Sequence, residues 1–205
     1  TALGTSAGAT TVASGAAVQI DGSGLAIAES FSIAGTGVSS GGALRNLANS
    51  NSLTGGITLT GASRINSDAG TLTISTGNIT GAAQNLTVGG AGNTTVSSQI
   101  LTGTGGLTKD GAGTLTLSNA NTFTGDTSID NGILNVTNGG ALGTSTTRLN
   151  GGTLNIDNVT LAGVPTIFVQ LGKGLGFDPD GGGALPPIGA LTGSGANAAY
   201  NGPIQ

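Results

Sequence analysis

Very few side chains of this 205-residue sequence can do acid–base, nucleophilic or metal chemistry. The sequence has no His and no Cys, with nine Asp or Glu and five Lys or Arg. Ser–His and Cys–His catalytic pairs and histidine-based metal sites are therefore excluded. A carboxylate pair is still possible, because strands that stack about 5 Å apart would bring acids from distant parts of the chain together. Asp110, Asp126 and Asp130 are the candidates for such a pair.

A polysaccharide-active enzyme would also need groups that orient a sugar. The sequence contains only four Phe and one Tyr, and its basic residues are scattered. We therefore expect no enzyme, no catalytic residue and no bound cofactor.

One acidic segment suggests calcium. Asp178-Pro179-Asp180-Gly181-Gly182-Gly183 resembles acidic, Gly-rich calcium loops, but the third oxygen ligand and the distal Glu of such loops are missing. A proline turn with flanking acids is the alternative. We expect no metal site, and the role of Asp178 and Asp180 stays open.

The charge distribution and the hydropathy exclude nucleic-acid-binding and membrane-spanning proteins. The formal net charge is −4 and the cations occur singly, as Arg45, Arg64, Lys109, Arg148 and Lys173. Nucleic-acid binding normally needs a clustered basic stripe, so we expect none. There is no apolar run of 18 or more residues to cross a membrane. The chain starts at Thr1 without a basic-then-apolar leader, which we interpret as a processed product or an excised piece.

Short alternating runs predict the elements that position these residues. Aliphatic residues alternate with Thr or Asn, the period-two pattern of a half-buried strand. Examples are 71–74, 114–117, 133–136 and 153–156. Leu115, Leu134 and Leu154 recur at intervals of 19 and 20 residues. A period near twenty with several short strands indicates the coil of a β-solenoid, and the small side chains favour its narrow interior over a sandwich.

One stretch carries a family resemblance. Gly105-Gly106-Leu107-Thr108-Lys109-Asp110-Gly111-Ala112-Gly113-Thr114-Leu115-Thr116-Leu117 and its continuation to Gly143 resemble the autotransporter-associated β-strand repeat, also called the passenger-associated transport repeat. Asn119 stands where the family often has Gly, and Asn also tolerates left-handed turn geometry. The resemblance implies a right-handed parallel β-helix with coils of about 20 residues, on an exported surface protein.

This architecture assigns roles to several residues of the repeat. We expect Asn121 to take part in side-chain ladders along the corners of the coils. Phe123 is expected to cover the edge of the core or to stack on an equivalent ring. Lys109 and Asp110 are expected in a solvated turn.

The chain divides into two parts on this reading. Residues 1–163 are predicted to form β-helix coils, and 164–205 an irregular Gly/Pro-rich segment that includes the apolar run 166–171. This segment is either a cap on the solenoid end or a surface for head-to-tail assembly by strand addition. We favour assembly.

These observations favour a structural protein of the bacterial cell surface or extracellular space, either a rigid passenger stalk or a subunit of a fibre. The expected partners are further copies of the chain or neighbouring repeats of a longer parent, with no nucleic acid and no membrane insertion. An adhesin that binds glycans or a host surface is the alternative, and it predicts an exposed aromatic or charged patch. A polysaccharide-active enzyme is less favoured than either.

Overall fold

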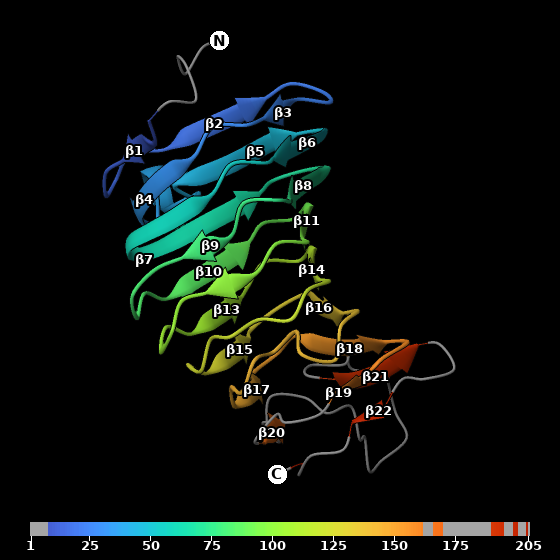
Figure 1. The fold of residues 1–205 in the computed structure, drawn as a ribbon. Coiled ribbons are helices and arrows are strands. Elements are labelled where there is room, and N and C mark those ends of the chain that lie inside the picture. The colour runs from blue at the N-terminus through green and yellow to red at the C-terminus, as the bar shows by residue number, and fades with distance from the viewer. Residues whose placement is uncertain (1–7, 162–165, 170–189, 195–198, 201–203, 205) are drawn as a thin grey trace.

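A computed structural model describes residues 8–161, 166–169, 190–194, 199–200 and 204. Within these residues the strands pair in parallel, each with the equivalent strand of a neighbouring coil (Figure 1). The coils up to β14 contribute strands to three faces, and the next two coils contribute strands to faces 2 and 3 only. Faces 1 and 2 belong to one 12-stranded sheet, and face 3 is an 8-stranded sheet. The predicted all-β parallel β-solenoid is confirmed.

The strands are short, as the alternating runs predict. Face 1 consists of β1 (Thr10–Val12), β4 (Phe31–Gly35), β9 (Ile79–Thr80), β12 (Ile100–Leu101) and the first half of β7 (Ile57–Ser67). Face 2 consists of the second half of β7 with β2 (Val18–Asp21), β5 (Leu44–Ala48), β10 (Leu86–Gly89), β13 (Leu107–Lys109), β15 (Thr127–Ile129), β17 (Thr147–Leu149) and β20 (Ile167–Val169). Face 3 consists of β3 (Ala26–Ile27), β6 (Ser50–Leu53), β8 (Thr71–Ile74), β11 (Asn93–Val96), β14 (Thr114–Leu117), β16 (Ile133–Val136), β18 (Thr153–Asp157) and β21 (Ala190–Ser194). The remaining elements are a pair formed by β19 (Thr160–Leu161) and β22 (Ala199–Tyr200), and a 3-10 turn, η1 (Val38–Ser40).

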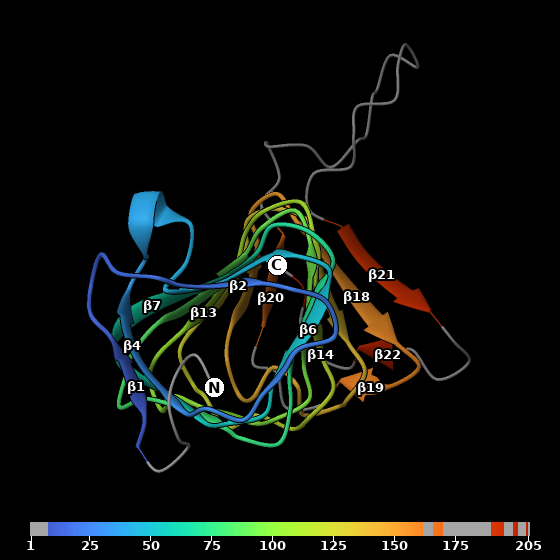
Figure 2. The same ribbon diagram turned by 90° about the horizontal axis from the view of Figure 1, so that it is seen from above.

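The register between coils reproduces the period seen in the sequence. Leu115, Leu134 and Leu154 are Cα partners on β14, β16 and β18. Viewed from the N-terminal end, the chain runs clockwise as it recedes (Figure 2), so the coils are right-handed. This is the hand that parallel crossover connections almost always take.

Stacked aliphatic side chains fill the interior. On face 3 the inward positions form two columns, each at most 3% exposed: Leu72, Thr94, Leu115, Leu134 and Leu154, and then Ile74, Val96, Leu117, Val136 and Ile156. Burying one such aliphatic side chain contributes about 1.5–3 kcal/mol. Because each column is built from successive coils, a coil buries its core only against its neighbours.

Glycine is required at the corner between faces 2 and 3. Gly111 and Gly132 have φ values of +72° and +66° there, in consecutive coils. A Cβ at Gly132 would collide with the carbonyl oxygens of Gly111 and Gly113. The coils can therefore turn and approach this closely only without a side chain at this position.

The described parts of 164–205 continue the pairing of the preceding coil. Strand β20 pairs with β17, β21 with β18, and Ile204 bridges to Ile167. Asp178 and Asp180 lie outside the described residues, so the calcium question is untouched. A capping or assembling role for this segment stays a prediction. In the described part of the chain no helix is long and apolar enough to cross a membrane.

Candidate functional site

Five of the eleven charged side chains that the structure describes gather at one corner of the stack, where face 2 turns into face 3. We call this the polar corner and define it by Arg45, Arg64, Asn66, Asp68, Lys109 and Asp110. Arg45 contacts Asp68 through Nη2 at 2.6 Å and Nε at 2.7 Å. Asn66 donates to Asp68 Oδ1 at 2.6 Å and accepts from Arg64 Nη2 at 3.0 Å. The hydrogen bond to Asp68 raises the pKa of the Arg45 guanidinium above its usual value.

The strongest pair of the polar corner skips a coil. Arg64 donates to both carboxylate oxygens of Asp110, Nη1 to Oδ2 at 2.6 Å and Nη2 to Oδ1 at 2.8 Å. In the coil between them Gly89 is the Cα partner of Asn66, and a Cβ at Gly89 would collide with Asp110 Oδ1 and Arg64 Nη2. The ion pair therefore lies over a glycine, and such fork-to-fork pairs are the stronger and more directional ones.

Lys109 lies inside the solenoid, so the expectation of a solvated turn is wrong for this residue. It is 2% exposed and occupies an interior column between Val88 and Ile129. Its Nζ donates to the backbone oxygens of Asp110 at 2.6 Å, Gly111 at 2.8 Å and Asn131 at 3.2 Å. Burial lowers the pKa of the ammonium to about 8, against an opposing effect of Asp110. Asp110 itself is half-buried against Arg64.

The other two candidate acids each have their own partners. Asp130 Oδ1 accepts from Ser128 Oγ at 2.6 Å and from Asn150 Nδ2 at 2.9 Å. Asp126 pairs with Arg148 at 3.1 Å, with both side chains about half exposed. Asp110 and Asp126 are therefore each neutralised by an Arg, and Asp130 follows Ile129, the register partner of Lys109 in the next coil. Within the described residues no three metal-binding side chains cluster.

The next corner along the coil, where face 3 turns into face 1, is held by neutral groups. We call it the amide corner and define it by Asn78, Gln99, Asn119 and Asn121. Asn121 Oδ1 accepts from Ile100 N at 2.8 Å, and its Nδ2 donates to Ala141 O. It therefore joins the coil before it and the coil after it, through backbone groups rather than through other Asn side chains. A side-chain ladder does occur on face 3, where Asn155 donates to Asn135 Oδ1 at 2.8 Å.

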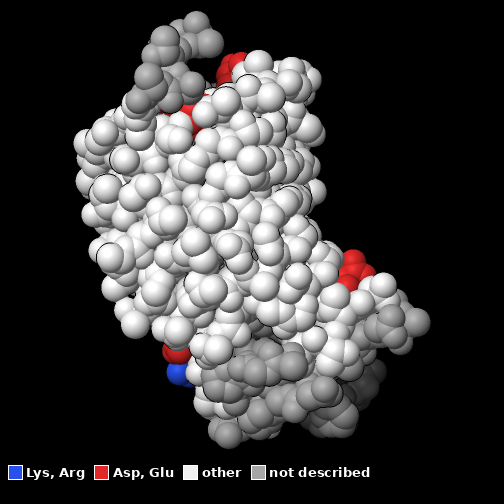
Figure 3. All heavy atoms as spheres, in the orientation of Figure 1, with Lys and Arg blue, Asp and Glu red and all other residues white. Residues whose placement is uncertain are grey.

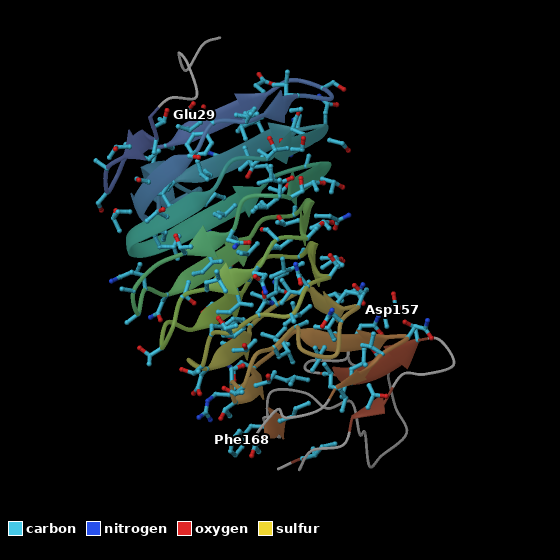
Figure 4. The ribbon with its side chains drawn as sticks, in the orientation of Figure 1. Glu29, Asp157 and Phe168 are labelled. Atoms are coloured by element: carbon cyan, nitrogen blue, oxygen red, sulfur yellow. The ribbon has the colours of Figure 1, made fainter. Side chains whose placement is uncertain are left out.

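The aromatic residues do not form an adhesive patch in the described part of the chain. Phe123 is fully buried, as is Phe31, so Phe123 lies in the core rather than at its edge. The ring of Phe168 lies under the Arg148 guanidinium, 4.9 Å from its centre, at the C-terminal end of the stack (Figure 4). The view in Figure 3 shows few charged groups on this face of the molecule.

The outer surface of face 3 is instead a row of small polar groups. Successive strands place one outward residue each in register, namely Ser52, Thr73, Thr95, Thr116, Asn135, Asn155 and Thr192. We call this set the hydroxyl row. It carries no charge, and its members are spaced by the distance between coils, about 4.8 Å.

Sequence reasoning missed two features of the polar corner. Lys109 stands two positions after Leu107, so the period-two alternation already places it on the buried side. The pairing of Arg64 with Asp110 has no local signal, because 46 residues separate them. Only the exact register of the intervening coil brings them together.

Comparison with known proteins agrees with the resemblance. Residues 107–136 match the model of the Passenger-associated-transport-repeat family, so the resemblance is confirmed over that stretch. The chain is also 54% identical over 56 residues to the Adhesin BmaC autotransporter of Brucella suis biovar 1 (strain 1330). That alignment covers 26% of the chain and 2% of the relative, so the chain spans a very small part of the relative's length. No solved structure matches the chain.

Proposed function

We propose that this chain is a rigid, non-enzymatic segment of a β-solenoid passenger displayed on a bacterial cell surface. The observation that carries the proposal is the unbroken parallel pairing of face 3 from β3 to β21. Such a stack is stiff along its axis and keeps a fixed distance between coils, because every coil is hydrogen-bonded to the next.

Side-chain links across coils support a structural role. Arg64 reaches Asp110 over an intervening coil, and Asn121 joins its two neighbouring coils. These links use the few polar side chains for cohesion. The match of residues 107–136 to a passenger repeat favours an exported, surface-displayed chain.

An adhesive role is the second candidate. It is favoured by the name of the relative that is 54% identical over 56 residues, and by the uncharged hydroxyl row. On this alternative the row would contact a neutral surface such as a glycan.

A binding assay separates the two roles. The purified chain is coated on beads, and attachment to host cells and to immobilised glycans is measured. The matched variants place Glu at Thr73, Thr95 and Thr116 of the hydroxyl row, or at Thr58 and Thr80, which are outward on face 1. A structural segment gives background attachment in all cases. Saturable attachment that only the hydroxyl-row variant loses would establish the adhesin instead.

Self-association through residues 164–205 belongs to the same proposal. Sedimentation velocity of the whole chain over a range of concentrations tests it. Mass that grows with concentration supports assembly, and a monomer at every concentration supports a cap.

A further inference from the structure

Three Asn-Gly steps occur at turns in the described part of the chain, at Asn131, Asn138 and Asn150. An Asn followed by Gly is the sequence most prone to cyclise, because Gly leaves the following backbone nitrogen unhindered. The structure gives the three steps different surroundings, which makes them internal controls for one another.

At Asn131 the reacting groups are already close. The Gly132 N–H donates to Asn131 Oδ1 at 2.7 Å, and Asn131 is exposed to solvent. Oδ1 is bonded to Cγ, the atom that the Gly132 nitrogen attacks, so this hydrogen bond keeps the nitrogen near Cγ, and reacting atoms held at about 3–3.5 Å are in a near-attack arrangement. The next N–H in the chain, that of Ile133, bonds to Gly113 O in the coil-to-coil ladder.

A buried cation touches the same peptide group. Lys109 Nζ lies 3.2 Å from the backbone oxygen of Asn131, which belongs to the Asn131–Gly132 peptide bond. When the Gly132 nitrogen loses its proton, negative charge spreads onto this oxygen. A donor that is preorganised where charge develops lowers the barrier of such a step.

We propose that Asn131 is a site of self-modification, at which the chain forms a succinimide and then aspartate or isoaspartate. The Gly132 nitrogen gives up its proton to solvent and attacks Asn131 Cγ, so that an N–C bond forms. Nδ2 takes up a proton from solvent, the Cγ–Nδ2 bond breaks, and ammonia leaves. Water then opens the ring at either carbonyl. The net change is replacement of an amide by a carboxylate, with one water consumed and one ammonia released.

The other Asn turns lack the hydrogen bond from the following N–H to Asn Oδ1, the following Gly, or the contact with a buried cation. Asn138 Oδ1 accepts from Gly140 N, two residues on. Asn150 Nδ2 donates to Ser128 Oγ and Asp130 Oδ1, so its amide is bonded to the preceding coil rather than to Gly151. Asn119 has the same contact as Asn131, with Ala120 N donating to its Oδ1 at 2.8 Å, but the next residue is Ala.

The modification changes the polar corner. It adds a negative charge between β15 and β16, beside the ammonium of Lys109. In the isoaspartate form it also adds one methylene to the backbone of a corner that accepts no Cβ at Gly132. The outcome is a slow, irreversible loosening of the contact between this corner and the corner at 111–113 of the preceding coil.

The test uses the whole folded chain, incubated in near-neutral buffer at physiological temperature. Peptide mapping by mass spectrometry follows the gain of about one dalton at each Asn, and enzymatic methylation of isoaspartate identifies the product. We expect Asn131 to convert about tenfold faster than Asn138 and Asn150. In concentrated urea, where the geometry is lost, the three rates should become similar. An Asn131 rate equal to or below that of the other two in the folded chain overturns the proposal.

Two variants assign the role of the cation. Lys109→Met should slow the conversion of Asn131 about tenfold, while the conversion rates of Asn138 and Asn150 stay the same. In Lys109→Arg the conversion rate of Asn131 should stay near that of the original chain. If Lys109→Met failed to fold, all three rates would converge on those in urea, and the comparison of Lys109→Arg with the original chain would decide. Folded Lys109→Met with an unchanged Asn131 rate excludes any part for Lys109.

Discussion

The polar corner and the amide corner of the solenoid join the same kinds of strands but are held by different forces. At the polar corner, Arg64 and Asp110 attract each other across a coil and Lys109 is buried among carbonyl oxygens. At the amide corner, Asn121 satisfies backbone groups of two coils without any charge. The stack thus shows that neutral amide bonds suffice to close a corner. The charges are an addition, and they should make one corner sensitive to salt and pH.

The largest effect is expected at the amide corner. Asn121→Leu leaves Ile100 N–H and Ala141 C=O without partners in a buried place, and each such group costs about 1–3 kcal/mol. We expect the free energy of unfolding to fall by about 2–4 kcal/mol, measured by urea denaturation. Asn119→Ala is the matched control, because Asn119 bonds to Ser97 O at a solvent-exposed position, and it should cost less than about 1 kcal/mol. Equal losses would contradict the ranking of these bonds.

The polar corner should give stability a distinct pH dependence. The pKa of Lys109 is lowered from 10.5 to about 8 in the folded chain. Between these pH values the unfolded chain keeps the proton and the folded chain does not, so stability rises with pH. The contribution is at most about 1.4 kcal/mol per pH unit, and it becomes flat as the pH falls below 8. Urea denaturation of the original chain and of Lys109→Met isolates it, since the variant should lack this rise. A parallel pH profile in both chains would contradict the buried ammonium.

The ion pair over Gly89 should matter more than an exposed pair. Arg64→Met leaves Asp110 half-buried without its partner, and we expect a loss of about 1–2 kcal/mol at low salt. Arg148→Met breaks an exposed pair and should cost about 0–1 kcal/mol. Thermal denaturation at low and high salt measures both. The Arg64 effect should shrink with salt but persist, and an Arg148 effect as large as the Arg64 effect would reverse the ranking.

A smaller, diagnostic effect is coupling between Gly89 and Arg64. Gly89→Ala forces the ion pair to move, because the new Cβ would collide with both of its members. In Arg64→Met no guanidinium lies there and Asp110 is no longer held over Gly89, so the same substitution should cost less there, by about 1 kcal/mol. A double-mutant cycle by urea denaturation measures this difference. Strict additivity would mean that the pair does not cross Gly89.

Much of this arrangement follows from simple patterns in the sequence. The spacing of Leu115, Leu134 and Leu154 predicts the coil, and the alternation of Thr114 to Leu117 predicts which side is buried. Lys109 was misplaced because a charged residue was assumed to be solvated, although the alternation after Leu107 puts it inside.

The polar corner itself could not be predicted. Coils near it differ in length by a few residues, and an error of one residue moves a side chain to the other face. Whether Arg64 meets Asp110 therefore depends on register that spacing alone does not define. Asn121 was correctly placed at a corner, but its partners are backbone groups that no side-chain pattern reveals.

The register of the coils is the central claim, and cysteine cross-linking tests it most directly because the chain has no Cys of its own. Thr95 and Thr116 are Cα partners on adjacent strands of face 3, within the reach of a disulfide. Thr73 and Thr116 are two coils apart, about 9–10 Å. The stack predicts that the Thr95→Cys/Thr116→Cys chain rapidly forms an intramolecular disulfide and keeps its stability. The Thr73→Cys/Thr116→Cys chain should form no disulfide within the chain. The opposite pattern, or equal oxidation of both, would contradict the parallel solenoid.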